Sequence, residues 1–281
     1  MIAYLGTGLL GAGFVQAMLK KEMEVRVWNR TPEKATALEQ YGAKAFADLV
    51  EAVEGANMIH ITLKDDDSVD EVLENAAAGF APGVMIIDHT TTSQAGAVKR
   101  TKYWKDKGFT YQHAPVFMGP KNALDSTGFM LISGDAVVAS ELTPHLSKLT
   151  GKVLNFGTEV GKAAAMKLIG NLFLISFTAG LADVLSLANA QGVELHELLD
   201  LFKDFNPAAA SIPHRLNLMH KGDFSHPTWE LNMARKDAQL FLNAADKAGE
   251  QLLVIPAIAA KMDSFIVEGH GGEDWMIIGK K

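Results

Sequence analysis

The stretch that decides the fold is MIAYLGTGLLGAGFVQAMLK, residues 1–20 of a 281-residue chain. Its first five residues are apolar enough for a short buried strand, and residues 12–20 have helical composition. Between them, Gly6, Gly8 and Gly11 have the spacing G-x-G-x-x-G. In this setting the first glycine permits a tight turn, the second lets a ligand approach the backbone, and the third lets the helix pack closely on the strand.

This glycine-rich turn predicts a dinucleotide-binding site. Phosphates bind well at a helix N-terminus because free N–H groups and the helix dipole favour an anion there. We therefore expect the pyrophosphate of a dinucleotide to contact the six residues of the turn, Gly6, Thr7, Gly8, Leu9, Leu10 and Gly11.

The kind of dinucleotide depends on the end of the next expected strand, residues 24–28. A site for NAD usually places an acidic residue there, which accepts hydrogen bonds from the ribose 2'-hydroxyl. This chain has Asn29, Arg30 and Thr31 instead. The planar guanidinium of Arg30 matches a 2'-phosphate, although an exposed arginine ahead of a helix that begins at Pro32 is the alternative explanation. We expect NADP (NADPH) as cofactor, with Asn29 and Thr31 as neutral donors.

Helical and strand patterns keep alternating through the first half of the chain. After the second strand we expect helices near residues 33–41 and 68–78 and one that starts near Ser93, and strands near 58–63, 84–88, 109–113, 129–133 and 153–156. This order predicts an α/β fold with a doubly wound parallel sheet, whose ligands bind at the carboxyl ends of the strands. Leu63, Lys64 and the run Asp88–Thr92 stand at those ends.

The second half of the chain opens with an apolar stretch, residues 158–189, that contains no proline. It predicts a long helix that is buried on all sides. The stretch is long enough to span a bilayer, but Lys167, Asn171 and Asp183 favour a protein core, so we expect no membrane contact. More apolar faces than one small domain can cover predict a homodimer or a homotetramer.

Helical patterns continue to the C-terminus, near residues 195–203, 233–248 and 256–268. Residues 206–226 are rich in helix breakers and are predicted to form a loop. The sequence therefore predicts two domains, a dinucleotide-binding domain at 1–157 and an all-helical domain at 158–281 for the substrate and for oligomerisation.

Lys167 and Asn171 are the polar exceptions within the long apolar helix. They are four residues apart and so project from the same face, and a lysine is rarely buried without a partner. One interpretation is structural, with the Lys167 side chain reaching a helix end and Asn171 filling a packing defect. The other is a reactive pair, and the residues upstream favour it.

Composition excludes several other classes of function. The net charge of −7 and the pI near 5.7 argue against a nucleic-acid partner. The chain has no cysteine, and its nine histidines show no H-E-x-x-H spacing, so we expect no metal site. The N-terminus runs directly into the first strand without a signal-like segment, which favours the cytoplasm.

With these residues assembled, the chain resembles the β-hydroxyacid dehydrogenase family, which includes 3-hydroxyisobutyrate dehydrogenases and glyoxylate/succinic semialdehyde reductases. The matching segments are Gly6–Gly11, Asn29-Arg30, Asp88–Thr91, Ala114–Val116, Lys167 with Asn171, and Lys236-Asp237. The resemblance implies an NADPH-dependent oxidoreductase that interconverts a small-molecule carbonyl compound and its alcohol. It also implies that Lys167 is the catalytic acid or base, that Asn171 binds the substrate, that Thr91 contacts the cofactor and that Lys236 lies near the nicotinamide.

One segment departs from that family. After Ala-Pro-Val the family usually has Ser-Gly-Gly, which presents donors to a substrate carboxylate, whereas this chain has Phe117-Met118-Gly119. We expect these three residues to line a more apolar substrate site that favours a bulkier, less polar carbonyl compound. The alternative is that Phe117 and Met118 point into the core while their N–H groups still bind an acid.

Two further functions stay open. Residues 27–35 are very similar to the corresponding run of imine reductases, which predicts reduction of a C=N bond. In that family the position of Lys167 usually carries aspartate, tyrosine or another residue, so Lys167 argues against it. The other hypothesis is a catalytically silent dinucleotide-binding protein, which the joint presence of Lys167, Asn171 and Lys236 makes less attractive.

Overall fold

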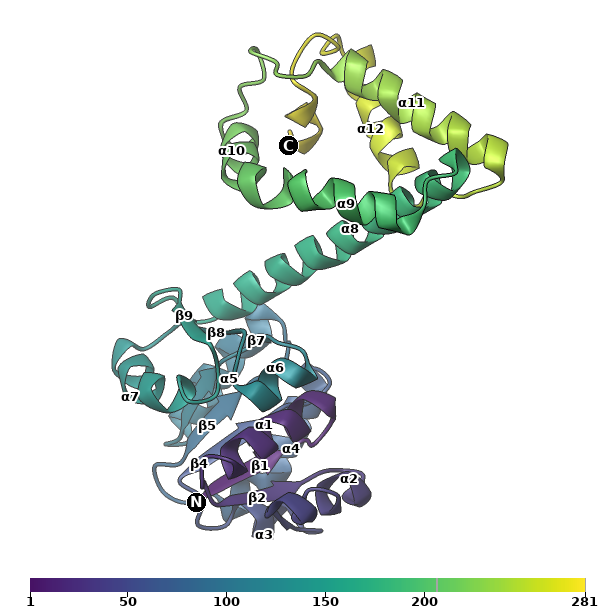
Figure 1. Ribbon diagram of the computed structural model, residues 1–281. Coiled ribbons are helices and arrows are strands. Elements are labelled where there is room, and N and C mark those ends of the chain that lie inside the picture. Colours follow the sequence, from purple (N-terminus) through teal and green to yellow (C-terminus); the bar gives the residue numbers. More distant parts are fainter. Residues whose placement is uncertain (206, 281) are drawn as a thin grey trace. The chain divides into compact units, whose positions relative to one another are not determined.

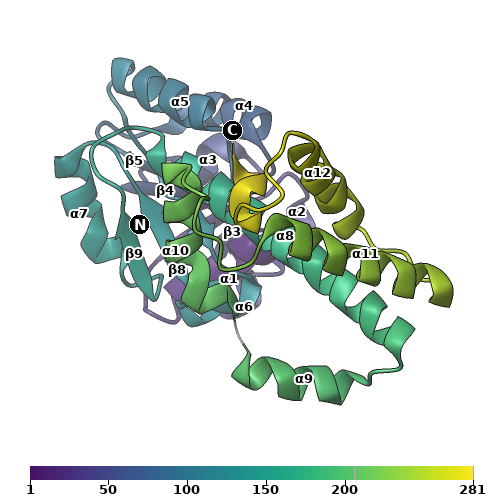
Figure 2. The same ribbon diagram turned by 90° about the horizontal axis from the view of Figure 1, so that it is seen from above.

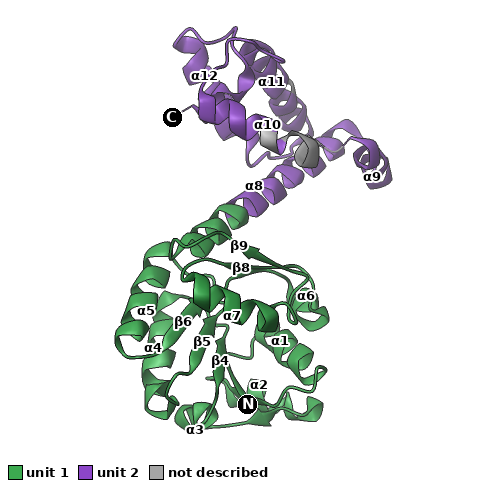
Figure 3. Cartoon of the chain, turned by 90° about the vertical axis from the view of Figure 1, so that its left-hand side faces the viewer, with its two compact units in different colours: residues 1–171 green, residues 172–281 purple. Residues whose placement is uncertain are grey.

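The structure is a computed structural model that describes residues 1–205 and 207–280, except for the side chains of 207–211, 213 and 240. The chain (Figure 1) divides into two compact units, Met1–Asn171 and Leu172–Lys281 (Figure 3). Each unit has its own core, and each is described by itself.

The first unit is built on a six-stranded parallel sheet, as the sequence predicts. Its strands are β1 (Ile2–Leu5), β2 (Val25–Trp28), β3 (Lys44–Ala45), β4 (Met58–Ile61), β5 (Met85–Asp88) and β6 (Thr110–His113). Their order in the sheet is β3-β2-β1-β4-β5-β6, and every pair is parallel. The strand order reverses beside β1, where a doubly wound sheet binds its ligand.

Helices cover both faces of this sheet (Figure 2). They are α1 (Leu9–Leu19), α2 (Pro32–Thr36), α3 (Leu49–Val53), α4 (Asp66–Ala76) and α5 (Gln94–Asp106), with 3-10 turns at Glu39–Tyr41 and Ala77–Gly79. The helix predicted near residues 33–41 is thus α2 followed by a 3-10 turn. The pattern missed β3 and α3, which are too short to show a period.

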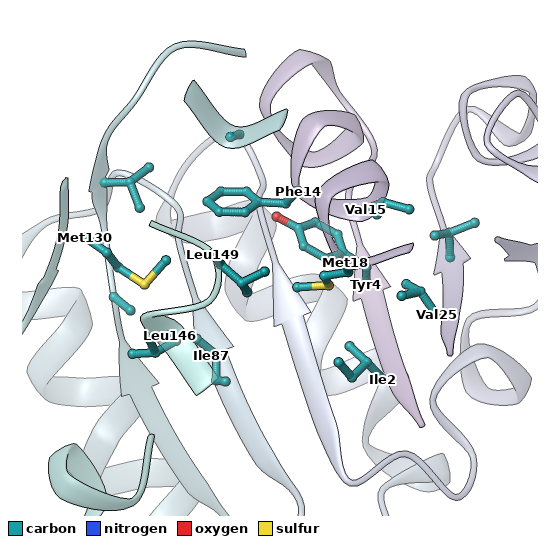
Figure 4. Close-up of a cluster of buried hydrophobic side chains, with 14 of the residues drawn as sticks. Ile2, Tyr4, Phe14, Val15, Met18, Val25, Ile87, Met130, Leu146 and Leu149 are labelled. Carbon is teal, nitrogen blue, oxygen red and sulfur yellow. The ribbon is translucent and has the colours of Figure 1, made fainter. Parts of the chain in front are cut away.

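Alternating side chains of the strands feed two separate hydrophobic clusters. On β1, Ile2 and Tyr4 pack against α1 in one cluster (Figure 4), whereas Ala3 and Leu5 pack against α3 and α4 in the other. All four side chains are buried. A strand that is buried on both faces has a continuous apolar run, which explains why the first five residues are all apolar or aromatic.

A second, three-stranded sheet completes the first unit. It contains β7 (Val116–Phe117), β8 (Phe129–Ile132) and β9 (Lys152–Asn155), with β7 antiparallel and β9 parallel to β8. Two helices that the sequence pattern missed, α6 (Pro120–Asp125) and α7 (Ala136–Leu146), accompany it. Gly13 lets α6 pack closely on α1, because a Cβ atom there would lie 2.8 Å from the Pro120 carbonyl oxygen.

The predicted long helix is α8 (Lys162–Gln191). Ala163, Ala164 and Lys167 in its first turns are buried in the first unit. The expectation of burial on all sides is wrong for the single chain. Large apolar side chains further along are exposed, namely Leu168, Ile169, Leu172, Phe173, Leu174, Ile175, Phe177, Leu181 and Leu185. The sequence shows which faces are apolar but not which molecule covers them.

By length and composition, α8 is long and apolar enough to cross a membrane, a test that core helices also pass. Three of its polar residues have partners within the protein. Lys167 bonds to Asn171, and the Asp183 carboxylate accepts hydrogen bonds from the N–H groups of Leu253, Val254 and Ile255. Three such bonds make Asp183 the anchor for the start of the helix that follows Val254.

The second unit is helical. Besides most of α8 it contains α9 (Leu195–Asp204), α10 (Pro207–Lys221), α11 (Leu231–Ala248), α12 (Ile255–Val267) and a 3-10 turn at Trp275–Gly279. Its small core joins α11 and α12 through Leu231, Ala238, Met262 and Phe265.

One expectation for this unit is wrong. The segment 206–226 was predicted to form a loop; Asn206 lies outside the described residues, and residues 207–221 form α10. Pro207 counted as a breaker, but it stands at the first helical position, where a missing N–H costs nothing.

Candidate active site

A cleft lies at the carboxyl ends of β1, β2 and β4, as expected for a doubly wound sheet. Its volume is about 540 Å³. Most of the predicted cofactor-binding residues line it, namely Gly6, Gly8, Leu9, Leu10, Gly11, Asn29, Arg30, Thr31, Leu63 and Lys64. We call this the dinucleotide cleft.

The three glycines of the turn have distinct steric reasons. Gly6 has a φ of +93°, and a Cβ atom on it would overlap the Thr62 carbonyl oxygen of the neighbouring loop. A Cβ atom on Gly11 would overlap the Gly6 carbonyl oxygen, so this glycine permits the close contact between helix and strand. Gly8 differs, because a Cβ atom there would meet nothing within 4 Å. Its missing side chain therefore keeps the space beside the backbone free.

The backbone of this turn fits a dinucleotide pyrophosphate. Gly8 is the N-cap of α1 and provides no side-chain hydrogen bond to the first N–H groups of the helix. The hydroxyl of Thr7 is buried and has no hydrogen-bond partner among the described residues. Unpaired donors at a helix N-terminus are the groups that bind a phosphate.

Two neighbouring residues at the end of β2 differ in role: Asn29 is structural, and Arg30 is free to bind a ligand. Asn29 Oδ1 accepts the Thr7 N–H at 3.0 Å, and its Nδ2 donates to the Thr31 carbonyl at 2.9 Å. Asn29 therefore joins the glycine-rich turn to β2. Arg30 is exposed at the cleft and has no hydrogen bond or salt bridge to any residue that the structure describes. Its guanidinium is thus available for an anionic ligand group.

The cleft also contains residues that sequence reasoning missed, namely Trp28, Lys34, Leu49, Thr62, Ser68, Glu71, Val72 and Asn75. Four of them come from α4, whose pattern shows a buried face but not that another part of the helix lines the cleft. Thr62 directly follows β4, and this position at a strand end is the signal that could have identified it. Of the predicted contacts, Thr91 is exposed on the loop after β5 and is absent from the cleft lining.

A second group of residues surrounds Lys167 at the start of α8. The Lys167 side chain is 8% exposed, and its Nζ donates to Asn171 Oδ1 at 3.0 Å. Its Nζ also lies 4.4 Å from the centroid of the Phe117 ring, a cation–π distance. Burial lowers the pKa of Lys167 below its usual value. We call Phe117, Lys167, Gly170 and Asn171 the lysine site.

Gly170 gives Phe117 its position. A Cβ atom on Gly170 would overlap the Phe117 ring, so the ring packs directly against the backbone of α8. Phe117 is the last residue of β7 and is held by antiparallel pairing with Phe129 of β8. The aromatic ring therefore lies beside the lysine ammonium in place of the polar donors that the family usually has.

Met118 and Gly119 contribute differently from Phe117. Met118 is half-buried and packs against the hydrophobic cluster beneath α1. The Gly119 N–H donates to Asn122 Oδ1 at 2.9 Å, as part of the cap of α6. This donor is consequently already used within the protein and does not point free toward a ligand.

Lys236 belongs to the second unit. It lies on α11 with a half-exposed side chain, and its Nζ is 3.0 Å from Asp237 Oδ1. The predicted pair Lys236-Asp237 is thus a salt bridge between neighbours on the helix.

Three histidines, from β4, from the loop after β5 and from α7, form a hydrogen-bonded chain. His89 Nδ1 is 2.8 Å from the Ala114 carbonyl, so this nitrogen donates, and His89 Nε2 accepts from His60 Nδ1 at 2.9 Å. His60 Nε2 then accepts from His145 Nε2 at 3.0 Å. Burial lowers the pKa of all three, that of His89 to about 4. Phe14 of α1 stacks on His89 with ring centroids 4.9 Å apart, which connects this neutral chain to the glycine-rich helix.

Two protein families match the chain in sequence. Residues 1–157 match the NAD-binding domain of 6-phosphogluconate dehydrogenase, and residues 161–280 match the NAD-binding family of NADP-dependent 3-hydroxyisobutyrate dehydrogenase.

Individual relatives are more distant. Human cytokine-like nuclear factor N-PAC is 28% identical over 248 residues, which cover 87% of this chain and 44% of that protein. The chain thus spans less than half the length of that relative. Glyoxylate/succinic semialdehyde reductase 2 of Arabidopsis thaliana is 28% identical over 91% of this chain and 72% of its own length.

Solved structures agree with the fold. The imine reductase from Myxococcus stipitatus in complex with NADP+ has a TM-score of 0.88 at 21% identity, covering 99% of this chain and 98% of that one. A reductive aminase from Aspergillus terreus in complex with NADPH and ethyl levulinate has a TM-score of 0.87 at 21% identity, with 99% and 97% covered. The two family matches extend over nearly the whole chain and agree with its two-part fold: the chain belongs to the family of the NAD-binding domain of 6-phosphogluconate dehydrogenase, which matches more than half of it, and its second part matches the family of NADP-dependent 3-hydroxyisobutyrate dehydrogenase.

Proposed function

We propose that this protein reduces a carbonyl compound to its alcohol with NADPH, and that Lys167 is the general acid. The observation that carries the proposal is the setting of Lys167, a buried ammonium that is held by Asn171 and has no carboxylate partner among the described residues. A lysine whose charge is not neutralised by an acid is free to stabilise negative charge that develops on a substrate.

The cofactor, Lys167 and Asn171 each have a separate role in the proposed reaction. Bound NADPH supplies the hydride for the carbonyl carbon. Lys167 keeps further N–H donors beyond the one bonded to Asn171, and these hydrogen-bond the carbonyl oxygen and stabilise the developing alkoxide. Because burial lowers the pKa of Lys167, the ammonium gives up its proton more readily than a surface lysine does. Asn171 fixes the direction of Nζ and contacts the substrate.

The preference for NADPH rests on Arg30. Its exposed guanidinium at the cleft has no partner in the described part of the chain, and Asn29 beside it is not an acid. A 2'-phosphate offers the planar anionic partner that a free arginine binds in a bidentate manner. A ribose 2'-hydroxyl offers no such charge.

The substrate class rests on Phe117 and Gly119. In the family pattern this turn presents donors to a carboxylate, but here one donor is replaced by an aromatic ring and another is bonded to Asn122. We expect the substrate to be an uncharged aldehyde or ketone with an apolar body that packs on Phe117.

A panel of substrates tests the reaction. The purified protein with NADPH should oxidise the cofactor in the presence of uncharged aldehydes, with the alcohol as product identified by chromatography. Amine formation from cyclic imines at a higher kcat/KM would instead support the second candidate, imine reduction. Absence of turnover with both panels, together with tight NADPH binding, would support a silent dinucleotide-binding protein.

Imine reduction stays a second candidate because of two observations. The fold is similar to imine reductases over 99% of this chain, and the aromatic ring of Phe117 gives the lysine site an apolar wall. Against it stands the charge of Lys167, because a protonated imine beside an ammonium would be repelled. Carbonyl reduction needs that same charge.

We further propose that the chain works as a homodimer or homotetramer. Large apolar side chains of α8 and α9 are exposed in the single chain, among them Leu172, Ile175 and Leu199. Soluble monomers rarely expose a contiguous patch of this kind, whereas obligate interfaces bury one. Light scattering at micromolar concentration tests this proposal, and a particle of one chain mass, 30.3 kDa, would contradict it.

A further inference from the structure

Two loops at the carboxyl ends of neighbouring strands are joined by a partly buried hydrogen bond. The β4 loop, Thr62–Asp65, contributes three residues to the dinucleotide cleft. The β5 loop, residues 89–93, follows the next strand of the sheet. Thr90 Oγ1 in the β5 loop accepts the Leu63 N–H of the β4 loop at 3.0 Å. The position of one loop therefore fixes that of the other.

Arg100 of α5 connects the two loops through its hydrogen-bond partners. Its side chain is 2% exposed, and its Nη2 lies 2.6 Å from Asp66 Oδ1, directly after the β4 loop. The other Asp66 oxygen accepts the N–H of Ser93, at the end of the β5 loop, at 2.9 Å. The Nη2 side of the Arg100 guanidinium is thus linked, through Asp66, to the C-terminal ends of both loops. A second carboxylate, Asp70, lies 3.1 Å from Nη1 and also pairs with Lys99, whose Nζ is 3.4 Å from Asp70 Oδ2.

The other side of Arg100 reaches the start of the β5 loop. Arg100 Nε donates to the Tyr111 hydroxyl at 3.0 Å, and this hydroxyl donates to Asp88 Oδ2 at 2.5 Å. Asp88 Oδ1 then accepts the Thr90 N–H at 2.8 Å. Burial raises the pKa of Tyr111 well above its usual value, so the phenol keeps the proton that it donates.

A glycine makes room for this arrangement. A Cβ atom on Gly96 would overlap Asp66 Oδ1 and lie 2.9 Å from Arg100 Nη2. Gly96 is in the first turn of α5, and its N–H is capped by Ser93 Oγ at 2.9 Å. A side chain at this position would therefore separate Arg100 from Asp66.

We propose that Arg100 is a positioning residue for the cofactor, which holds the β4 and β5 loops in their binding arrangement through Asp66 on one side and through Tyr111 and Asp88 on the other. Arg100 does not line the dinucleotide cleft itself. A buried charge network is a poor source of stability, but loops that are ordered before binding spare the ligand the cost of ordering them. The proposal rests on dinucleotide binding alone and not on the identity of the substrate.

The test interrupts the network at two points that leave the packing intact. Tyr111→Phe removes the hydroxyl that joins Arg100 to Asp88, and Thr90→Val removes the hydroxyl that accepts the Leu63 N–H. Each variant should raise the Kd for NADPH about five- to tenfold, and the double variant should raise it by less than the product, because both changes loosen the same loops. Fluorescence titration measures the Kd.

Amide hydrogen exchange separates positioning from a general loss of stability. In both variants the backbone amides at positions 63 and 90 should exchange faster without cofactor, and they should regain the protection of the parent protein when the cofactor is bound. Gln112→Met is the matched control, because it removes buried hydrogen bonds from β6 next to Tyr111 without touching either loop. Its Kd for NADPH should equal that of the parent.

Two outcomes would overturn the proposal. One is an unchanged Kd in both Tyr111→Phe and Thr90→Val. The other is a Kd for Gln112→Met that rises as much as theirs, since the effect would then follow from lost stability. Gly96→Ala provides an independent variant, in which the separation of Arg100 from Asp66 should weaken NADPH binding in the same range.

Discussion

The dinucleotide cleft and the lysine site belong to the same unit, yet they follow their family's pattern to different degrees. In the cleft, the space around the backbone explains each glycine of the turn, and Asn29 fixes the turn to β2. In the lysine site, Lys167 and Asn171 are present, but Phe117 stands where the pattern has a hydroxyl. The cleft therefore keeps the family's pattern, whereas the lysine site departs from it at Phe117.

The largest effect should come from Lys167. Lys167→Ala should lower kcat for carbonyl reduction by on the order of 10²-fold or more, because general acid catalysis typically contributes that much. The Kd for NADPH should hardly change, because Lys167 does not line the cleft. Lys162→Ala is the control, since Lys162 is exposed on the same helix and, among the residues that the structure describes, pairs only with Glu159. Near-normal kcat in Lys167→Ala would remove Lys167 from the mechanism and erase the distinction between the two regions.

The cleft itself is tested through Arg30. Arg30→Ala should weaken NADPH binding about 10- to 100-fold, the loss expected for charge-assisted hydrogen bonds, and leave NADH binding nearly unchanged. Titration of both cofactors with the parent and the variant measures this difference. Equal affinities of the parent protein for NADPH and NADH would contradict the assignment.

The departure in the lysine site is tested by restoring the family's residue. Phe117→Ser should raise the ratio of kcat/KM for succinic semialdehyde over an uncharged aldehyde about tenfold, since a hydroxyl replaces an apolar wall. Phe129→Ser is the matched control, because Phe129 pairs with Phe117 across β7 and β8 but is 46% exposed. A ratio that moves equally in both variants would show that Phe117 does not select the substrate.

Acid should destabilise the folded protein through the chain of three histidines. His60, His89 and His145 have lowered pKa values in the folded protein, so the unfolded chain binds protons first as the pH falls. The free energy of unfolding should therefore decrease from about pH 6.5, the usual histidine value, toward the pKa of His89 at about 4. Denaturant titrations at pH 7 and pH 5 measure the loss.

A histidine variant identifies the source of this pH dependence. Glutamine does not titrate, and its side-chain N–H can still donate to His60, so His145→Gln should reduce the difference between pH 7 and pH 5. His220→Gln changes an exposed histidine of the second unit and should leave the difference as it is. The same pH dependence in His145→Gln as in the parent would exclude the histidine chain as its cause.

The sheet and the glycine-rich turn could be predicted because their signals are local. Buried strands give short apolar runs, and the turn needs glycine at defined positions such as Gly6, whose φ is positive. The small second sheet was predicted only as two separate strands near 129–133 and 153–156, since pairing between β7 and β8 is not encoded in a period. Short helices such as α6 gave no signal for the same reason.

The lysine site was predictable in its residues but not in its arrangement. The spacing of Lys167 and Asn171 indicates a shared face, which the hydrogen bond between them confirms. The contact between Phe117 and Gly170 joins residues 53 positions apart, and only the tertiary fold brings them together. Sequence alone left open whether Phe117 and Met118 share one environment, whereas Phe117 contacts Lys167 and Met118 packs on the core.

We propose that the protein keeps the cofactor site of its family, whereas its substrate site favours an uncharged carbonyl compound over an acid. The most direct measurement is the kcat/KM of the parent protein, with saturating NADPH, for glyoxylate and succinic semialdehyde against uncharged aldehydes of similar or larger size. This comparison reports differential binding of the transition states. We expect the uncharged aldehydes to have the higher kcat/KM. An advantage of about tenfold or more for the carboxylated substrates, about 1.4 kcal/mol, would contradict the claim and identify an ordinary semialdehyde reductase.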